Sequence, residues 1–328
     1  MAGQATALAA DVATNVLALS GGVGGAKLSL GLEDALPEGD LHVLVNTGDD
    51  FEHLGLHISP DIDTLLYTLS GRANQALGWG LEGESWNAMA AMENIGGETW
   101  FRLGDKDLAT HLWRTRQMAQ GATLLDVTAD LSQRLGVKSH IHPMCEESVR
   151  TTVHTDEGEL PFQHYFVRRQ CEPSVSGFNF EGISAARPNR EVARLIQDSA
   201  FSRIVVCPSN PFVSIDPILQ IPGLWLALRD NTAPVILVSP IVAGLAIKGP
   251  AAKMMAELKV PVTALGVAEH YCSRYPELVD YFVIDESDAT LAPEVEELGL
   301  NVVVAPTVMK SREDKKRLAD ITLQLGKE

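Results

Sequence analysis

The chain has 328 residues, of which 45% are hydrophobic and 21% are charged, and its formal net charge is −17. This length accommodates one large α/β domain with an inserted subdomain, or two domains, and the composition is typical of a globular enzyme. The acidic charge argues against a nucleic acid polymer as partner, and the apolar runs are too short to span a membrane. A small anionic ligand would have to be bound by local amides, a few basic side chains or a metal ion.

Residues 1–14 are rich in alanine but lack a basic start followed by a long apolar core. They predict a flexible N-terminal extension rather than a signal peptide. The cysteines Cys145, Cys171, Cys207 and Cys272 are widely separated and form no C-x-x-C pair. This spacing indicates reduced thiols in a cytoplasmic protein and gives no zinc motif.

An alternation of strands and helices follows the extension. Val16–Leu19 and His42–Val45 are apolar runs, and each ends in a loop that leads into a helical pattern. The order strand, glycine loop, helix, strand, acidic loop, helix is typical of a doubly wound domain, where ligands bind at the carboxyl ends of the strands. We predict a Rossmann-like α/β core with a parallel sheet, formed by residues 15–100 and 191–310.

The first loop is rich in glycine, with Gly21, Gly22, Gly24 and Gly25 followed closely by Lys27. Glycines let the backbone approach a ligand, and the amides that open the next helix can bind phosphate oxygens. We predict a phosphate-binding loop in which Lys27 adds a positive charge. The pattern fits neither G-x-G-x-x-G nor the P-loop, so the alternative is a tight strand-to-helix turn without a ligand.

The second loop and the helix after it carry four aspartates: Asp49, Asp50, Asp61 and Asp63. Ser59 stands at the N-cap position of this helix, and for Asp61 or Asp63 alone the alternative explanation is a favourable interaction with the helix dipole. Four carboxylates near a phosphate loop repel one another unless a cation lies among them. We therefore predict Mg²⁺ bound by Asp49, Asp50 and Asp61 together with substrate phosphates.

Residues 101–190 change in character and predict an inserted subdomain of mixed α+β structure. Two helices come first, and Arg114 on the first of them is interpreted as a solvated surface residue. Alternating patterns at Val149–His154 and Phe162–Val167 then predict antiparallel strands. Just before the insertion lie Trp79, Trp86 and Trp100, which indicate either ordinary packing or an aromatic wall for a flat heterocycle.

The alternation of strands and helices resumes at residue 191. Further buried strands are predicted at residues 204–207, 235–238, 260–265, 281–284 and 302–304. Ser209 and Asn210 follow the first of these strands and are predicted to bind a nucleotide, although a plain turn is the alternative. Residues 311–328 predict a charged C-terminal helix.

Several motifs occur in a fixed order: S-G-G-V-G-G-A-K, N-T-G-D-D, S-P-D-I-D-T, W-F-R-L-G-D-K-D-L-A-T-H, F-Q-H-Y-F-V, P-S-N-P and V-S-P-I. In these motifs the chain resembles the CofD family of 2-phospho-L-lactate transferases, which act in the biosynthesis of the deazaflavin coenzyme F-420. The resemblance covers residues 15–310.

The resemblance implies a substrate pair and a reaction. The donor is guanosine diphosphate linked to a three-carbon acid, the acceptor is the ribityl hydroxyl of the deazaflavin Fo, and GMP is released. Asp63, Asp50 and Asp61 are then the candidate catalytic residues, and Asp63 is expected to contact the acceptor hydroxyl with Arg102 nearby. Trp86 falls in the region that lies near the acceptor in the family.

Two other functions stay open at this stage. One is a nucleotide-sugar-binding regulator like the YvcK-like proteins, which share a similar glycine loop but lack the P-D-x-D-T and W-F-x-L-G-D segments. The other is a nicotinamide-dependent oxidoreductase, which is suggested by the fold alone. The transferred acid, whether lactate, enolpyruvate or glycerate, is not identified by the sequence, and a homodimer is the default expectation.

Overall fold

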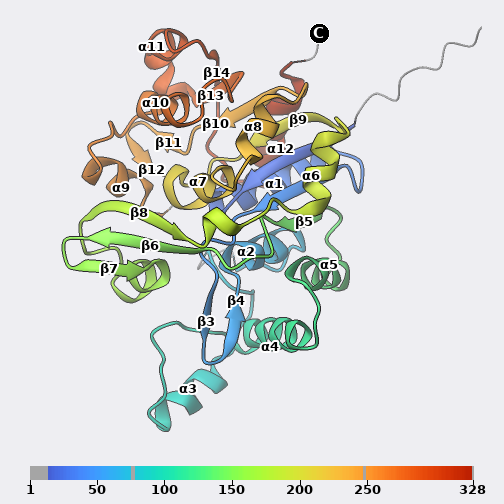
Figure 1. Ribbon diagram of the computed structural model, residues 1–328, viewed down its shortest axis with the longest axis vertical. Helices are drawn as coiled ribbons and strands as arrows, with labels where there is room; N and C mark the ends of the chain where they lie inside the picture. Colours follow the sequence, from blue (N-terminus) through green and yellow to red (C-terminus); the bar gives the residue numbers. More distant parts are fainter. Residues whose placement is uncertain (1–13, 75–77, 247–248, 327–328) are drawn as a thin grey trace, which may run out of the picture.

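The computed structural model describes residues 14–74, 78–246 and 249–326, and a seven-stranded parallel sheet forms its centre (Figure 1). The predicted extension over residues 1–14 lies outside these ranges except for Thr14. The sheet consists of β1 (Asn15–Ser20), β2 (Leu41–Val45), β5 (His140–Pro143), β9 (Phe201–Val206), β10 (Val235–Val238), β13 (Tyr281–Asp285) and β14 (Asn301–Ala305).

The strand order is β5-β2-β1-β9-β10-β13-β14. Counted along the chain, this is the 3-2-1-4-5-6 order of a Rossmann-like fold with one more strand at the end. The prediction of a doubly wound α/β fold is confirmed. The order reverses between β1 and β9, so the loops after these two strands lead to helices on opposite faces of the sheet.

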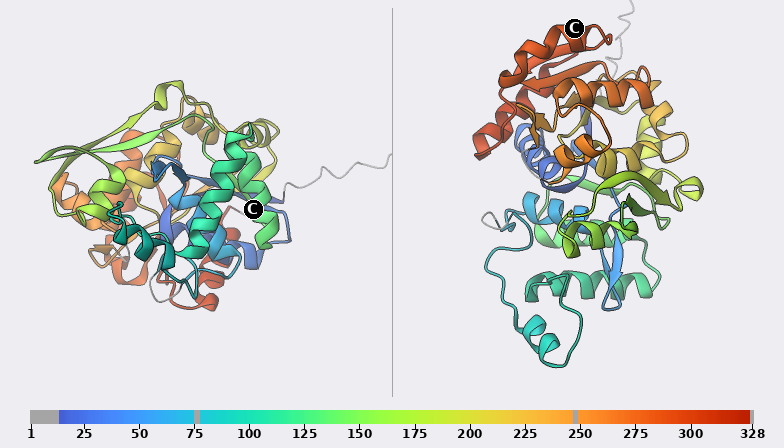
Figure 2. Two further views of the ribbon diagram at one scale, coloured as in Figure 1. Left: turned by 90° about the horizontal axis from the view of Figure 1, so that it is seen from below. Right: turned by 90° about the vertical axis from the view of Figure 1, so that its left-hand side faces the viewer.

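Both faces of the sheet are buried, because successive side chains of each strand point to opposite sides. In β1, Val16 and Ala18 belong to one core, and Leu17 and Leu19 belong to the other. Helices cover both faces (Figure 2). The first core is covered by α1 (Gly22–Ala35), α2 (Pro60–Leu69), α5 (Leu124–Leu135) and α12 (Arg312–Gln324).

The second core is covered by α6 (Arg190–Gln197), α7 (Asp216–Leu219), α8 (Leu224–Arg229), α9 (Ala251–Glu257), α10 (Ala264–Arg274) and α11 (Ala292–Glu296). Short turns accompany these helices: η3 (Pro211–Ile215), η4 (Glu286–Leu291) and the hairpin β11 (Ile241–Val242) and β12 (Leu245–Ala246). No helix in the described part of the chain combines the length and apolarity needed to cross a bilayer.

Two segments extend from the core: in Figure 1 the first lies at the bottom, and the second lies at mid-height on the left. The first contains the hairpin β3 (Phe51–His53) and β4 (Leu56–Ile58), then α3 (Asn87–Asn94) and α4 (Asp105–Ala119). The second contains β6 (Arg150–Thr155), β7 (Gly158–Pro161), η1 (His164–Arg168), β8 (Val175–Glu181) and η2 (Ile183–Ala185). The hairpin leads directly from β2 into α2, and it therefore connects the two halves of the acidic segment.

Two predictions, the range of the insertion and one strand, need correction. The range 101–190, predicted as an insertion, contains β5, which pairs in parallel with β2 as the edge strand of the main sheet. The predicted strand at 260–265 is wrong, because Pro261 cannot donate a ladder hydrogen bond and Thr263 caps α10 by accepting from the Gly266 amide. The predicted C-terminal helix is present as α12.

The predicted strand at Phe162–Val167 is also wrong. This segment forms the helical turn η1, and β7 takes the place beside β6, across the turn after Thr155, that the segment was expected to fill. Phe162 and Tyr165 are buried, whereas Phe166 is exposed. Phe162 and Tyr165 are three residues apart, which is helical spacing. The alternation of apolar and polar residues in this segment therefore did not indicate a strand.

Candidate active site at the switch point

The site is built from loops that meet where the strand order reverses. Gly21 follows β1, Asn46–Asp50 follows β2, and Cys207–Asn210 follows β9. The N-terminus of α2, with Asp61, faces the same edge. Because parallel strands present their carboxyl ends together, segments far apart in the sequence converge here, as expected for a doubly wound fold.

The glycine turn is held by side chains from two of these loops. The Ser209 hydroxyl accepts from the Gly21 amide at 3.1 Å and donates to the Gly21 carbonyl at 2.7 Å. The Gly22 amide donates to Asp61 Oδ1 at 2.7 Å. Asn210 accepts from the Phe212 amide and so caps η3. Ser209 and Asn210 therefore order the loops at the switch point, and their predicted contact with a nucleotide stays a prediction.

Gly24 and Gly25 lie in the first turn of α1 and pack tightly against the loop after β9. A Cβ at Gly24 would lie 2.2 Å from the carbonyl oxygen of Pro208, and one at Gly25 would lie 2.5 Å from Ser209 Oγ. These glycines are needed for the close approach of α1 to β9, in addition to any role in ligand binding.

Replacing Gly24 with alanine is expected to lower the free energy of unfolding by about 1–3 kcal/mol, because the backbone of Pro208 must move. Urea denaturation measures this loss. Gly177→Ala is the matched control, since the nearest atom to its new Cβ would be 3.8 Å away. A Gly24→Ala protein with unchanged stability but weakened nucleotide binding would show instead that this position meets the ligand.

Asp61 is buried in the first turn of α2, beside the glycine turn. Its Oδ2 accepts from Asn46 Nδ2 at 3.0 Å, and Asn46 also donates to the Val213 carbonyl at 3.2 Å. Burial raises the pKa of Asp61 to about 6, although the hydrogen bonds from Asn46 and Gly22 oppose the shift. The charge of Asp50 raises it further. A cation bound beside Asp61 would stabilise the charged carboxylate and so remove the free-energy cost of burying that charge.

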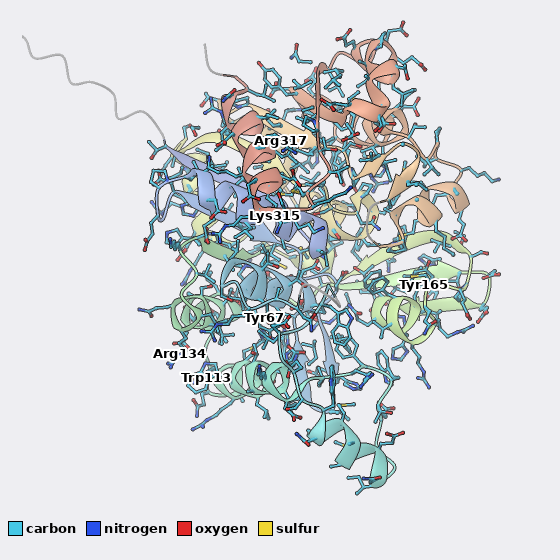
Figure 3. All side chains as sticks on the ribbon, turned by 180° about the vertical axis from the view of Figure 1, so that it is seen from behind. Tyr67, Trp113, Arg134, Tyr165, Lys315 and Arg317 are labelled. Carbon is cyan, nitrogen blue, oxygen red and sulfur yellow. The ribbon has the colours of Figure 1, made fainter. Side chains whose placement is uncertain are left out.

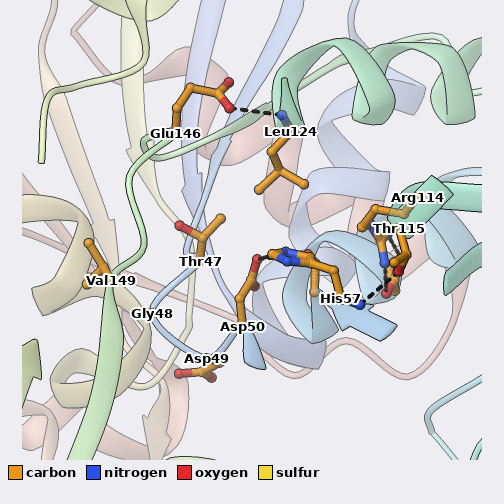
Figure 4. Close-up of polar contacts among 12 residues, drawn as sticks. Thr47, Gly48, Asp49, Asp50, His57, Arg114, Thr115, Leu124, Glu146 and Val149 are labelled. Atoms are coloured by element: carbon orange, nitrogen blue, oxygen red, sulfur yellow. Dashed lines mark hydrogen bonds and ion pairs between the residues drawn. The ribbon is translucent and has the colours of Figure 1, made fainter. Parts of the chain in front are cut away.

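Asp49 and Asp50 leave the loop after β2 in different directions (Figure 4). Asp50 Oδ2 accepts from Ser59 Oγ at 2.7 Å and lies 3.1 Å from His57 Nε2. Ser59 occupies the N-cap position of α2, but its hydroxyl serves Asp50 and makes no cap hydrogen bond. Oδ1 of Asp49 and Oδ1 of Asp50 are buried without a hydrogen-bond partner among the described residues.

These carboxylates suit a divalent cation that is shared with a substrate. Within residues 14–74, 78–246 and 249–326, no three His, Cys, Asp or Glu side chains form a ready-made metal cage. Burial, and next the charge of Asp61, raise the pKa of Asp49 well above its usual range. Mg²⁺ typically takes one or two protein carboxylates and completes its shell with phosphates and water. The two unpartnered oxygens and the destabilised charges fit that type of ion.

Asp63 faces a different neighbour from Asp61. The two are about 200° apart around α2, since 3.6 residues make one turn. Arg114 of α4 binds both oxygens of Asp63, with Nη1 at 3.1 Å from Oδ2 and Nη2 on Oδ1. Arg114 is 0% exposed. The interpretation of Arg114 as a solvated surface residue is wrong, and the catalytic assignment of Asp63 stays a prediction.

The remaining predicted residues lie around this centre. The Arg102 guanidinium stacks 4.5 Å above the Trp86 ring, so the basic partner of Asp63 is Arg114 and not Arg102. Lys27 Nζ donates to the Met309 carbonyl at 3.4 Å, in the segment between β14 and α12.

Sequence reasoning missed Asn46, His57 and Arg114 as members of the site. His57 and Ser59 alternate along β4 and its continuation, which puts both side chains on the face toward Asp50. The two-residue spacing of His57 and Ser59 in the sequence could therefore have identified both as members of the site. Arg114 lies three residues after His111 on α4, a helical neighbour, but nothing in the sequence shows which helix that pair would face.

These features define a Rossmann-like α/β protein whose buried carboxylates and glycine turn suit an anionic nucleotide and a divalent cation. The sequence matches the family described as 2-phospho-L-lactate transferase CofD over residues 16–317. The chain belongs to this family and is a transferase. The resemblance seen in the motifs is thereby confirmed.

Known relatives cover nearly the whole chain. The 2-phospho-L-lactate transferase of Methanosarcina mazei is 37% identical over 309 residues, which are 94% of this chain and 99% of the relative. The phosphoenolpyruvate transferase of Streptomyces griseus is 36% identical over 318 residues, 95% of this chain and 98% of the relative. A solved structure from the UPF0052 family of Bacillus halodurans has a TM-score of 0.63 at 16% identity, covers 94% of this chain and 98% of its own, and shows the same fold.

Proposed function

We propose that the protein transfers a three-carbon phospho-acid from a guanosine diphosphate-linked donor to the ribityl hydroxyl of Fo, in coenzyme F-420 biosynthesis. The hydroxyl oxygen attacks the phosphorus that carries the acid, the bond from that phosphorus to the GMP oxygen breaks, and the hydroxyl proton passes to a carboxylate. The single observation that supports this best is the row of buried carboxylates at the switch point of a CofD-family fold.

The donor is proposed to lie on the Asp61 side of the site. There the N-terminus of α1 would face the donor phosphates; because the Gly21 and Gly22 amides already donate to Ser209 and Asp61, the next amides of the turn, beginning with Val23, are the ones proposed to bind phosphate oxygens. Asp49 and Asp61 would hold Mg²⁺, which neutralises phosphate charge when bound, so that Oδ1 of Asp50 is left for the acceptor proton. Transfers at phosphorus depend mainly on such positioning and charge neutralisation.

The acceptor is proposed to lie on the Asp63 side. Asp50 is linked to both sides, because it accepts from Ser59 at the start of α2 and pairs with His57, whose amide donates to Thr115 of α4. Its unpartnered Oδ1 makes Asp50 the better candidate to take the hydroxyl proton, because a carboxylate bound by a guanidinium is a weaker base. Trp86 with Arg102 would cover the deazaflavin ring.

The experiment that tests this proposal supplies Fo and Mg²⁺ with each of three donors, carrying phospholactate, enolpyruvyl phosphate or phosphoglycerate. Mass spectrometry of the product and release of GMP are expected for at least one donor. A thermal shift with GDP and with NAD, with and without Mg²⁺, separates the alternatives. Absence of product from every donor, together with stabilisation by NAD, would overturn the proposal.

The protein is proposed to work in a reducing cytoplasm. Cys145, Cys171, Cys207 and Cys272 are all free thiols, and two of them are buried. Burial raises the pKa of Cys145 and of Cys207 to about 12, which keeps both thiols protonated and unreactive.

A further inference from the structure

A buried polar network joins α2 to α4 behind the acidic loop. We call it the α2–α4 network, and its members are Asp63, Tyr67, Asp107, His111 and Arg114. His111 Nδ1 lies 3.2 Å from Arg114 Nη1, and His111 Nε2 lies 3.2 Å from Asp107 Oδ2. The Tyr67 hydroxyl donates to Asp107 Oδ1 at 2.6 Å. All five side chains are buried.

Helical spacing places these residues face to face. Asp107, His111 and Arg114 are separated by four and three positions and share one side of α4. Asp63 and Tyr67 are four apart and share one side of α2. In Figure 3, Tyr67 lies in the interior, while Trp113 and Arg134 mark the outer side of this part of the molecule.

The network is expected to contribute little to the free energy that holds α2 and α4 together. Burial opposes the charge of Arg114, and the interaction with Asp63 offsets this effect, so that the pKa of Arg114 is raised. Replacement of buried ion pairs by apolar residues is often neutral or stabilising. A bidentate guanidinium does, however, fix both oxygens of its carboxylate in one orientation. The arrangement is therefore better suited to fixing the orientation of Asp63 than to stabilising the contact between α2 and α4.

We propose that Arg114, supported by His111, is a positioning residue that orients Asp63 for the acceptor hydroxyl. Each Asp63 oxygen uses one lone pair for Arg114 and keeps another for a hydrogen bond from the hydroxyl. Asp63 then holds the acceptor in line with the phosphorus while Asp50 takes the proton. This inference rests on the proposed function.

The test compares Arg114→Lys with Arg116→Lys, which changes an exposed arginine on the same helix. Lysine keeps the charge but cannot bind both oxygens. We expect Arg114→Lys to fold and to bind GDP within about twofold of the wild type, yet to lower kcat about tenfold to a hundredfold, as misplacement of a reacting group does. Arg116→Lys should match the wild type. A wild-type kcat in Arg114→Lys would overturn the inference.

A second variant covers the case in which Arg114→Lys does not fold. Asp63→Asn with Arg114→Gln removes both charges, and we expect its melting temperature to exceed that of either single variant. Activity of this pair should stay low if the network positions Asp63, and restored activity would overturn the inference. A wild-type protein inactive with every donor counts against the proposed function, whereas an active wild type with an unaffected Arg114→Lys counts against this inference alone.

Discussion

Turnover is expected to disappear when EDTA removes divalent metal and to return when Mg²⁺ is added in excess. The reason is the cluster of buried carboxylates at the switch point, where burial raises the pKa of Asp61 to about 6 and raises the pKa of Asp49 well above its usual range. Donor phosphates brought to the same place would add more negative charge. Without a cation these charges repel, so neither donor binding nor transition-state neutralisation is effective. Steady-state assays before and after chelation measure the effect.

Two controls make this result specific to the site. EDTA already saturated with Mg²⁺ should leave turnover unchanged, which excludes an effect of the chelator itself. Asp49→Asn and Asp61→Asn should each need more Mg²⁺ for half-maximal activity than the wild type does. Full turnover in metal-free buffer would remove the basis for assigning Asp49 and Asp61 to the metal.

The second large effect is expected for Asp50→Asn, which should lower turnover about a hundredfold or more, a typical contribution of a positioned general base. An amide keeps the shape of the side chain and can still accept from Ser59, so the fold should persist. Loss of one charge beside Asp61 also removes repulsion, and the melting temperature without metal should not fall. Rate, melting temperature and GDP affinity are measured on one preparation.

The matched control for this variant is Asp198→Asn, since Asp198 pairs with Arg194 on an exposed helix end and surface pairs contribute little. Its rate and stability should equal those of the wild type. Near-normal turnover in folded Asp50→Asn would exclude Asp50 as the proton acceptor and favour Asp63 for that role.

The sequence by itself determined the class of fold and the place of the site. Continuous apolar runs identify parallel strands buried on both faces, and this signal is local. The glycine turn after Val16–Leu19 and the aspartates after His42–Val45 stand directly at strand ends, so their meeting at one edge follows from the doubly wound topology. The family resemblance, carried by short motifs, pointed to the same edge.

The tertiary structure alone decided which side chains pair. Asp63 and Arg114 are 51 residues apart, and Gly21 and Ser209 are 188 apart. A helical pattern shows which residues share a face but not which element that face will meet. Arg114 therefore looked solvated in the sequence although its face of α4 packs onto α2. The same limit hid the place of β5 in the main sheet, because pairing with β2 depends on how the intervening hairpin and helices fold back.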